Sequence, residues 1–230
     1  MISRAFRKYA NDLETFPGDA ARAWRSAGAA GVWLELRRRT FDRAGGFSRY
    51  LVIEADLSTI REIPMPDGIE IRPFKGPDWS LLGDLGGYRL TRCFARAAEA
   101  GRVCLVAWRG STAVGYIWFS PKTEKCYENF DLSMPPDTIY LWQIKVARSE
   151  RRRGVGAALG SFGLVMARGQ GYRRSWMITR SDNLAAQSTI ASLAPSRVFG
   201  SVNRIKVTSW MHTRFHVLPT PQPLPRASIL

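Results

Sequence analysis

The sequence predicts an α/β fold in which a mixed central sheet is flanked by helices and preceded by an N-terminal helical extension. Three observations support this prediction. From about Glu70 onward, the apolar residues alternate between strand and helix spacing in the order β-α-α-β-β-β-α-β-α-β-β. The length of 230 residues fits one domain with extensions. An apolar content of 45% is typical of a chain with a packed core.

Residues 1–66 are predicted to form a basic helical extension. Val32, Leu36 and Thr40 recur at helical spacing, Trp33 lies beside them, and four arginines between positions 37 and 43 add positive charge. Three interpretations stay open. The extension is an accessory helix packed on the main domain, an amphipathic helix that lies on an anionic membrane surface, or, with least support, a helix that binds nucleic acid.

The main domain is predicted to cover residues 67–217, because Pro64 and Pro66 interrupt the chain after a short strand at 50–55. Residues 218–230 carry prolines at alternate positions and are expected to form an extended, flexible tail. Strands are expected at 69–73, 103–108, 113–120, 138–147, 175–179, 197–202 and 204–217. Helices are expected within 77–85, at 90–97, at 155–166 and between a cap at Ser181 or Asp182 and Pro195.

The formal net charge of +15 is the most unusual bulk property of the chain. Arginine supplies most of this charge, and its planar guanidinium binds phosphate through two hydrogen bonds at once. The charge is compatible with nucleic acid, an anionic membrane surface or a phosphate-bearing cofactor as partner. Codon usage in a GC-rich genome is the alternative explanation.

Cysteine usage and apolar patterning predict a cytoplasmic protein. Cys93, Cys104 and Cys126 show no metal-type spacing and cannot all pair with one another, which favours a reducing compartment and buried thiols. The first residues are basic but lack the apolar stretch of a secretory signal. No stretch approaches the roughly 18 apolar residues that a membrane-spanning helix needs.

The most informative segment runs from Val146 to Ala157 and reads VARSERRRGVGA. It is expected to end a strand, turn, and begin an amphipathic helix. The amides at a helix N-terminus are unpaired and favour a bound phosphate, and glycines at positions 154 and 156 let phosphate oxygens approach the main chain. A dinucleotide-binding turn would need a third glycine where Leu159 stands, and no Walker A lysine is present.

The pattern Arg151-x-x-Gly154-x-Gly156-Ala157 resembles the coenzyme A pyrophosphate loop of the GNAT superfamily of acyl-CoA-dependent N-acetyltransferases. The resemblance extends over most of residues 69–217 and implies a GNAT-type sheet. Asn183 stands where the family places an asparagine that contacts the pantetheine arm. The implied cofactor-binding residues are Ile144, Lys145, Val146, Arg151, Arg152, Arg153, Gly154, Val155, Gly156, Ala157 and Asn183.

The resemblance further implies direct transfer of an acetyl or other acyl group from acetyl-CoA, or another acyl-CoA, to a primary amine. The co-substrate would enter a V-shaped opening between the strands at 138–147 and 175–179. The Ile144 amide would polarise the thioester carbonyl, and much of the rate enhancement would come from positioning. The acceptor, a small molecule or a protein, is not specified by the sequence.

The acid and base of the reaction do not follow the family pattern. The usual tyrosine would fall near Ile190, so Ser188 is the hydroxyl chosen in its place, with Thr189 and Ser192 nearby. The usual glutamate of the fourth family strand is missing, and Gln143 is chosen as the residue that could hold a water for proton relay. Glu128 and Asp131 are alternatives.

Other functional classes receive less support. His212 and His216 lie four residues apart on an expected strand, roughly 13 Å from each other at about 3.3 Å per residue, so no metal site is expected. The tryptophans at 108, 118, 142 and 210 are interpreted as core residues. Two alternatives to an enzyme remain: an acyl-CoA-binding regulatory module that has lost catalysis, and a basic RNA-binding protein. No motif supports binding to nucleic acid or to a membrane surface.

Overall fold

The computed structural model describes residues 16–21, 23–25, 28–33, 36, 45–86, 91–123, 132–207 and 210–224. Its strands are β1 (Gly45–Asp56), β2 (Glu70–Pro73), β3 (Val103–Arg109), β4 (Thr112–Ser120), β5 (Thr138–Val146), β6 (Arg174–Arg180), β7 (Ser196–Val207) and β8 (Trp210–Pro223). Its main helices are α2 (Gly83–Gly86), α3 (Thr91–Glu99), α5 (Val155–Gly169) and α6 (Leu184–Leu193), and the 3-10 turns are η1 (Leu57–Thr59), η2 (Trp79–Leu82) and η4 (Arg148–Glu150).

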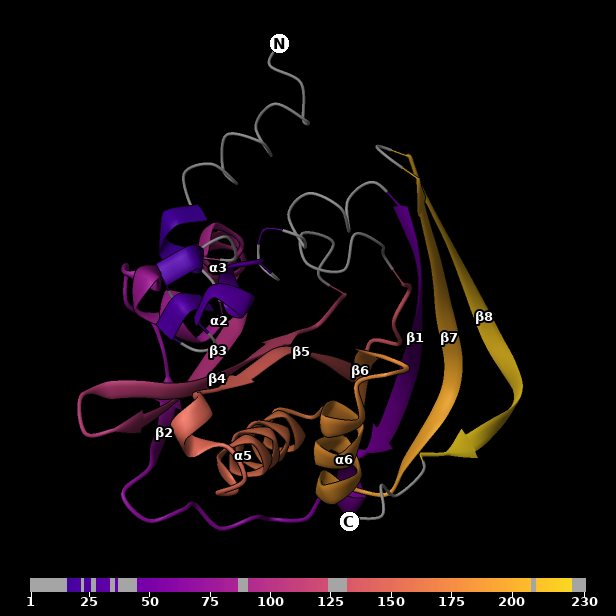
Figure 1. Ribbon diagram of the computed structural model, residues 1–230. Coiled ribbons are helices and arrows are strands. Elements are labelled where there is room, and N and C mark those ends of the chain that lie inside the picture. The colour runs from indigo at the N-terminus through magenta and orange to yellow at the C-terminus, as the bar shows by residue number, and fades with distance from the viewer. Residues whose placement is uncertain are drawn as a thin grey trace.

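The strands form one sheet of eight in the order β2-β3-β4-β5-β6-β1-β7-β8. All neighbours are antiparallel except β5 and β6, which run parallel because α5 connects them. Helices α5 and α6 cover one face of the sheet, and α2 and α3 cover the other face near β3 and β4 (Figure 1). This arrangement confirms the predicted α/β fold with a mixed central sheet flanked by helices.

Strand β1 lies in the interior of the sheet, between β6 and β7. Leu51 pairs with Thr179 of β6 on one side and with Ser201 of β7 on the other. Val52 and Ile53 have no exposed surface and belong to the cores on opposite faces. The sequence predicts this strand to belong to the extension that ends at residue 66, whereas the structure makes it an integral part of the main sheet. The local pattern identified a strand correctly but carried no information about its partners.

The core beneath the sheet is made by α5 and α6. Leu159 and Leu164 of α5 are fully buried, and Leu193 of α6 packs with them. The helix approaches the sheet so closely that a Cβ at Gly163 would lie 1.9 Å from the Phe119 ring. Glycine is therefore required at position 163 by packing, although it lowers helix propensity.

The core on the other face is aromatic. Trp118 and Trp142 stack with ring centroids 5.2 Å apart, and Phe94 of α3 lies 5.3 Å from Trp118. Trp108, Trp118 and Trp142 are buried, which confirms their interpretation as core residues, whereas the surroundings of Trp210 lie outside the described residues. The helical segments between residues 16 and 36 lie on the same side as α2 and α3 (Figure 1).

The C-terminal strands differ from the predicted pair at 197–202 and 204–217. Strand β7 continues to Val207, and β8 begins at Trp210. Asn203 was predicted to separate the two strands, but it lies inside β7 and pairs with Arg214. Strand β8 also extends to Pro223, so the first six residues of the predicted tail belong to the sheet edge. Prolines are tolerated there because an edge strand has one unpaired side.

Of the two cysteines that the structure describes, Cys104 is the free thiol expected from the sequence and Cys93 is not. Cys104 is a free thiol, and burial raises its pKa well above the ordinary value, which makes it inert. Cys93 of α3 is disulfide-bonded. Among the described helices, none combines the length and the apolar character needed to cross a bilayer.

Removal of residues 1–66 is expected to abolish folding, because β6 and β7 would lose their common neighbour and the backbone groups that pair with it. A chain of residues 67–230 should show no cooperative thermal transition by circular dichroism. A chain of residues 45–230 is the matched control, since it keeps β1, and it should melt cooperatively. Cooperative melting of the shorter chain would contradict an integral role for β1.

Gly163→Ala is expected to lower the free energy of unfolding by about 1–3 kcal/mol, because the new Cβ displaces the Phe119 ring. Denaturant titration measures this effect. Gly169→Ala, at the end of the same helix, is the control because its Cβ would meet no atom within 4 Å. The control should be as stable as the wild type or slightly more stable. Equal stability of both variants would show that the contact with Phe119 relaxes freely.

Candidate active site

A β-bulge in β5 shapes the centre of the candidate site. Trp118 of β4 pairs with Trp142, and Tyr116 pairs with Lys145, so β5 contains one residue more than β4 across this interval. Gln143 lies within the bulge and has a φ of 54°, in the left-handed region that non-glycine residues seldom occupy. A bulge bends the strand that contains it, and such strain is concentrated at functional positions.

The bend separates β5 from β6. The two parallel strands pair from Thr138 with Arg174 to Leu141 with Met177, and the pairing stops there, directly before the bulge. Residues 142–146 of β5 therefore have no β6 partner, and their main-chain groups on that side face the opening. This divergence lies between the two strands for which the sequence resemblance implies a V-shaped opening.

The loop that follows β5 brings the N-terminus of α5 to the open end of the divergence. Gly154 is the N-cap residue, with a φ of 82°, and no side chain caps the helix. The first intrahelical bond runs from the Ala158 amide to the Gly154 carbonyl at 2.9 Å. The amides of Val155, Gly156 and Ala157 precede this bond, so the helix leaves them available to a ligand.

The first turn of α5 also lies against the end of β5. A Cβ at Gly156 would lie 3.5 Å from Val146 and 3.9 Å from Ile144. The structure thus brings the predicted residues of β5, which include the exposed Lys145, next to the predicted residues of the loop and of α5. The sequence predicts these cofactor-binding positions from two separate segments, and the structure places the two segments side by side.

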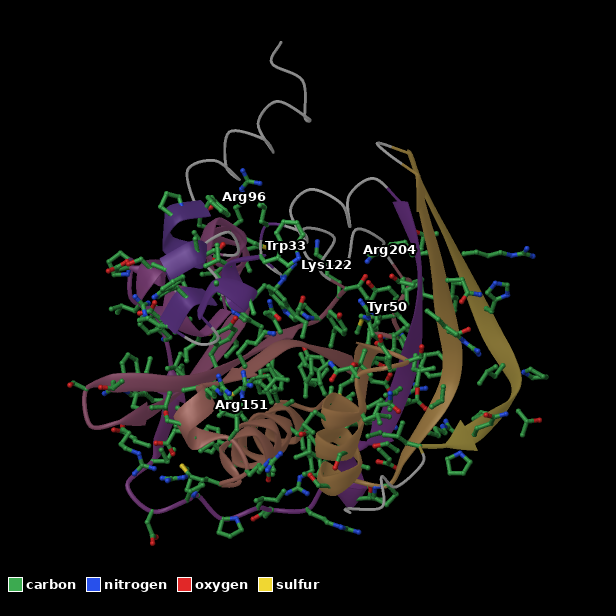
Figure 2. The ribbon with its side chains drawn as sticks, viewed as in Figure 1. Trp33, Tyr50, Arg96, Lys122, Arg151 and Arg204 are labelled. Atoms are coloured by element: carbon green, nitrogen blue, oxygen red, sulfur yellow. The ribbon has the colours of Figure 1, made fainter. Side chains whose placement is uncertain are left out.

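The loop arginines are exposed and surround the helix N-terminus. Arg151 donates from Nε to the Val146 carbonyl at 3.3 Å, and its position near the start of α5 can be followed in Figure 2. Arg152 has a φ of 62°, so two of the four residues from 151 to 154 have a positive φ. Arg153 lies 3.9 Å from Glu150, which leaves much of its guanidinium open to a ligand.

A buried carboxylate at the start of this loop anchors it to the β3–β4 hairpin. Glu150 is only 6% exposed, and Arg109 of β3 donates to both of its oxygens, with both distances 2.9 Å. Arg109 also donates to the Asp67 carbonyl, so the network joins the loop to the β3–β4 hairpin and to the segment before β2. The hydrogen bonds from Arg109 lower the pKa of Glu150. No local pattern in the sequence indicates a role for Glu150 or Arg109, because the two residues lie 41 positions apart.

The second wall of the opening ends at the N-terminus of α6. Asn183 is the N-cap, and its Oδ1 accepts from the Ala186 amide at 3.2 Å. This corrects the predicted cap at Ser181 or Asp182, because Arg180 binds the Asp182 carboxylate instead. Buried Gln187 donates to the Ser181 carbonyl at 3.0 Å and holds the turn in place. The main-chain amide of Asn183 donates to the Arg180 carbonyl at 3.0 Å, so its side-chain nitrogen, Nδ2, is the group that remains available for a ligand.

The candidate acid and base occupy different surroundings. Gln143 is 8% exposed and lies in the bulge, whereas Ser188 is half-buried on α6. The neighbouring hydroxyls of Thr189 and Ser192 donate to helix carbonyls, which leaves Ser188 the better choice of the three. Ile190 is buried and supplies no proton. The alternatives Glu128 and Asp131 lie outside the described residues.

The histidines considered as metal ligands, at 212 and 216, both lie on β8, as the sequence pattern predicted. Strand β8 is the last strand of the sheet, so these histidines are separated from the divergence by β1 and β7. Within the described part of the chain, no three His, Cys, Asp or Glu side chains come together in a metal-binding group.

A family model described as the acetyltransferase (GNAT) family matches residues 70–193, which is more than half of the chain. This range contains the divergence, the arginine-rich loop and both helix N-termini. The chain therefore belongs to the GNAT acetyltransferase family. The match begins after β1, so the contribution of residues 45–56 to the sheet is visible only in the structure.

Solved structures with the same fold are remote in sequence. A Drosophila protein aligns with a TM-score of 0.55 and 13% identity, over 80% of this chain and 68% of its own. A GNAT acetyltransferase from Colwellia psychrerythraea aligns with a TM-score of 0.50 and 17% identity, over 95% and 76%. The glucosamine N-acetyltransferase region of a fungal multi-domain β-N-acetylglucosaminidase aligns with a TM-score of 0.53 and 10% identity, over 74% and 22%. A comparison with proteins of curated function finds no match. These similarities establish the fold.

Glu150→Gln is expected to lower the melting temperature at neutral pH, because it removes the charge that Arg109 binds. The native pKa of Glu150 is lowered, so its contribution to stability is complete above its ordinary value of 4.5 and is lost as the pH falls through the native value. The difference in melting temperature between wild type and variant should therefore shrink below pH 4.5.

Asp182→Asn is the matched control, because it removes a similar pair with Arg180 whose side chains are 57% and 64% exposed. Exposed pairs contribute little, so this variant should melt close to the wild type. An equal effect of the two substitutions would show that the Arg109–Glu150 pair is no more important than a surface ion pair.

Proposed function

We propose that the chain is an N-acyltransferase that moves an acetyl or other acyl group from acyl-CoA directly to a primary amine. One observation carries this proposal: the uncapped N-terminus of α5 lies at the open end of the β5–β6 divergence. This arrangement offers a phosphate site and an extended strand edge side by side. Acyl-CoA has a pyrophosphate followed by an extended, amide-containing arm that would use both.

The residues present fit a pyrophosphate. The amides of Val155, Gly156 and Ala157 point from the helix N-terminus, where the helix dipole favours negative charge. The left-handed conformation of Gly154 turns the chain sharply into the helix. Arg152 and Arg153 are exposed and would form charge-assisted hydrogen bonds with phosphate oxygens.

The free edge of β5 fits the rest of the co-substrate. Main-chain groups beyond Leu141 lack a β6 partner, so the amides of the pantetheine arm would pair with Ile144 and Val146 as a strand would. The Ile144 amide is then the donor to the thioester oxygen, where negative charge develops during attack. Asn183, at the opposite wall, would donate from its side-chain nitrogen, Nδ2, to the pantetheine arm.

The bound acyl-CoA supplies an activated acyl group, and the residues of the chain position the amine and handle protons. Gln143 would hold a water that receives a proton from the amine. The amine nitrogen, which has already lost one proton to this water, bonds to the thioester carbon as the carbon–sulfur bond breaks. Its second proton would pass through the Ser188 hydroxyl to the leaving sulfur, which departs as free thiol. No covalent bond to the enzyme forms. Positioning accounts for most of the rate enhancement, in keeping with a site that has no strong acid or base.

The net charge of the chain is the basis for proposing an acceptor amine that also carries an acidic group. The net charge of +15 repels polyamines and attracts anionic molecules. Acceptor screening should therefore begin with amines that bear a carboxylate or phosphate.

The double variant Arg152→Gly/Arg153→Gln is expected to bind acetyl-CoA at least about tenfold more weakly than the wild type, because charge-assisted hydrogen bonds contribute about 1.5–3 kcal/mol. Calorimetric titration measures the affinity. Glycine at position 152 suits its positive φ, so the variant should fold normally. Release of free thiol in the presence of candidate amines then measures turnover.

Arg96→Gln/Arg214→Gln is the control, because it removes two exposed charges from α3 and β8, away from the loop. Its affinity for acetyl-CoA should equal that of the wild type. Equal weakening in both double variants would indicate non-specific attraction to a basic surface. Binding without thiol release from any amine would favour an acyl-CoA-binding module, and no binding of any acyl-CoA would refute the proposal.

A further inference from the structure

A cavity of about 930 Å³ lies at the ends of the central strands, at the opposite end of the sheet from the arginine-rich loop. It is formed where β5, β6 and β7 begin and where β1 ends, and the C-terminal end of α5 contributes Arg168. Nothing in the proposed acyl transfer uses this cavity. Its lining is strongly charged, with four arginines and three carboxylates.

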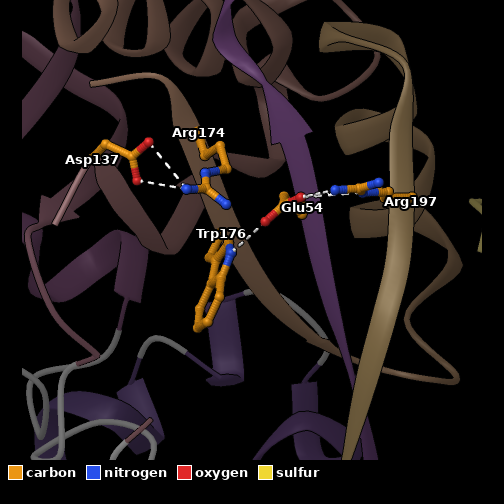
Figure 3. Close-up of polar contacts among 5 residues, drawn as sticks. All are labelled: Glu54, Asp137, Arg174, Trp176 and Arg197. Atoms are coloured by element: carbon orange, nitrogen blue, oxygen red, sulfur yellow. Dashed lines mark hydrogen bonds and ion pairs between the residues drawn. The ribbon is translucent and has the colours of Figure 1, made fainter. Parts of the chain in front are cut away.

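The carboxylates of the cavity are already engaged by the protein. Glu54 accepts from the Trp176 indole at 3.0 Å and from Arg197 Nη2 at 2.6 Å (Figure 3). Arg174 donates to both oxygens of Asp137 at 2.9 and 3.1 Å. The third carboxylate, that of Asp56, accepts from the Ser58 amide at 2.8 Å.

The groups that face the open cavity are mainly guanidinium groups. The Glu54 side chain is 10% exposed, whereas the Arg197 side chain that covers it is 58% exposed. Arginine has five N–H donors, and Arg197 uses only Nε and Nη2 in its contact with Glu54. The remaining donors of Arg197 can bind another acceptor without breaking this pair.

Two further arginines add charge that the cavity itself does not neutralise. Arg173 is exposed, and no described carboxylate forms an ion pair with it. Arg168 pairs at 3.1 Å with Glu62, which lies outside the cavity lining and is 72% exposed. Such a surface pair is weak, so Arg168 can turn to a ligand at little cost.

We propose that this cavity is a second binding site, separate from the acyl-CoA site, for a small molecule that carries a carboxylate or phosphate group. Arg168, Arg173 and the free donors of Arg197 bind the anionic group. The volume is within the range of about 300–1,000 Å³ typical of small-ligand pockets. The three carboxylates would repel the repeated charges of a nucleic acid backbone, so a small molecule fits better than a polyanion.

The two sites are at opposite ends of α5. The 15 residues of this helix span about 22 Å at 1.5 Å per residue. An anion in the cavity therefore cannot touch the loop at residues 151–154. Binding at the two sites can be measured independently, and failure of the acyltransferase proposal would leave this site unaffected.

The test uses the full chain labelled with ¹⁵N and follows the indole signal of Trp176, assigned by triple-resonance methods. This indole donates to Glu54 at the base of the cavity. Sodium phosphate and sodium succinate are titrated separately at constant ionic strength, since added salt screens charge. A saturable shift in the millimolar range with either anion is expected, and the more effective anion identifies the favoured group.

Arg168→Gln/Arg173→Gln should weaken this response at least about tenfold, because it removes the unneutralised charges. The variant should fold, because Arg173 is exposed and the contact of Arg168 with Glu62 lies at the surface. If the double variant does not fold, Arg173→Gln alone is tested in its place. The loop variant Arg152→Gly/Arg153→Gln is the control and should respond like the wild type. No shift with either anion, or an undiminished shift in the cavity variant, would overturn the proposal.

Discussion

The pairing of β1 with both β6 and β7 is the constraint on which the rest of the molecule depends. Without it, the sheet would consist of two separate parts, each with an unpaired edge in its interior. Its apolar residues also join the cores on the two faces, through Val52 on one side and Ile53 on the other. Because β1 holds β6 on one side, β6 can separate from β5 on the other side without losing its place in the sheet.

That separation opens the sheet between β5 and β6 by ordinary strand geometry. One extra residue in β5, accommodated by the left-handed Gln143, turns the strand away from its neighbour. Two helices then begin at the resulting gap, and each presents N-terminal amides to it. The Arg109–Glu150 pair fixes the loop that leads into the first helix, and Gln187 fixes the turn that leads into the second. The elements that shape the opening are therefore held by contacts with residues far away in the sequence or in an adjoining helix.

Local structure was predictable from the sequence, and long-range placement was not. The loop at 151–157 and its helix follow from glycine positions and helical spacing, which are properties of neighbouring residues. The bulge at Gln143 lies in the strand sequence TIYLWQIKV, which contains no glycine, asparagine or proline and gives no sign of a left-handed residue. Burial of Glu150 depends on Arg109 in the β3–β4 hairpin. The interior position of β1 depends on β6 and β7, which follow it by more than a hundred residues. Such pairings are decided by tertiary contacts that no local pattern encodes.

The interior position of β1 has a consequence for synthesis of the protein. Leu51 emerges from the ribosome more than a hundred residues before its partners Thr179 and Ser201. A nascent chain therefore carries an apolar strand with two unsatisfied edges until β6 and β7 have been translated, and non-local pairing of this kind folds slowly. During this interval the strand is a natural target for chaperones and an exposed site for aggregation. The sheet can close only after β6 and β7 have been made, so correct folding waits for strands that lie more than a hundred residues further along the sequence.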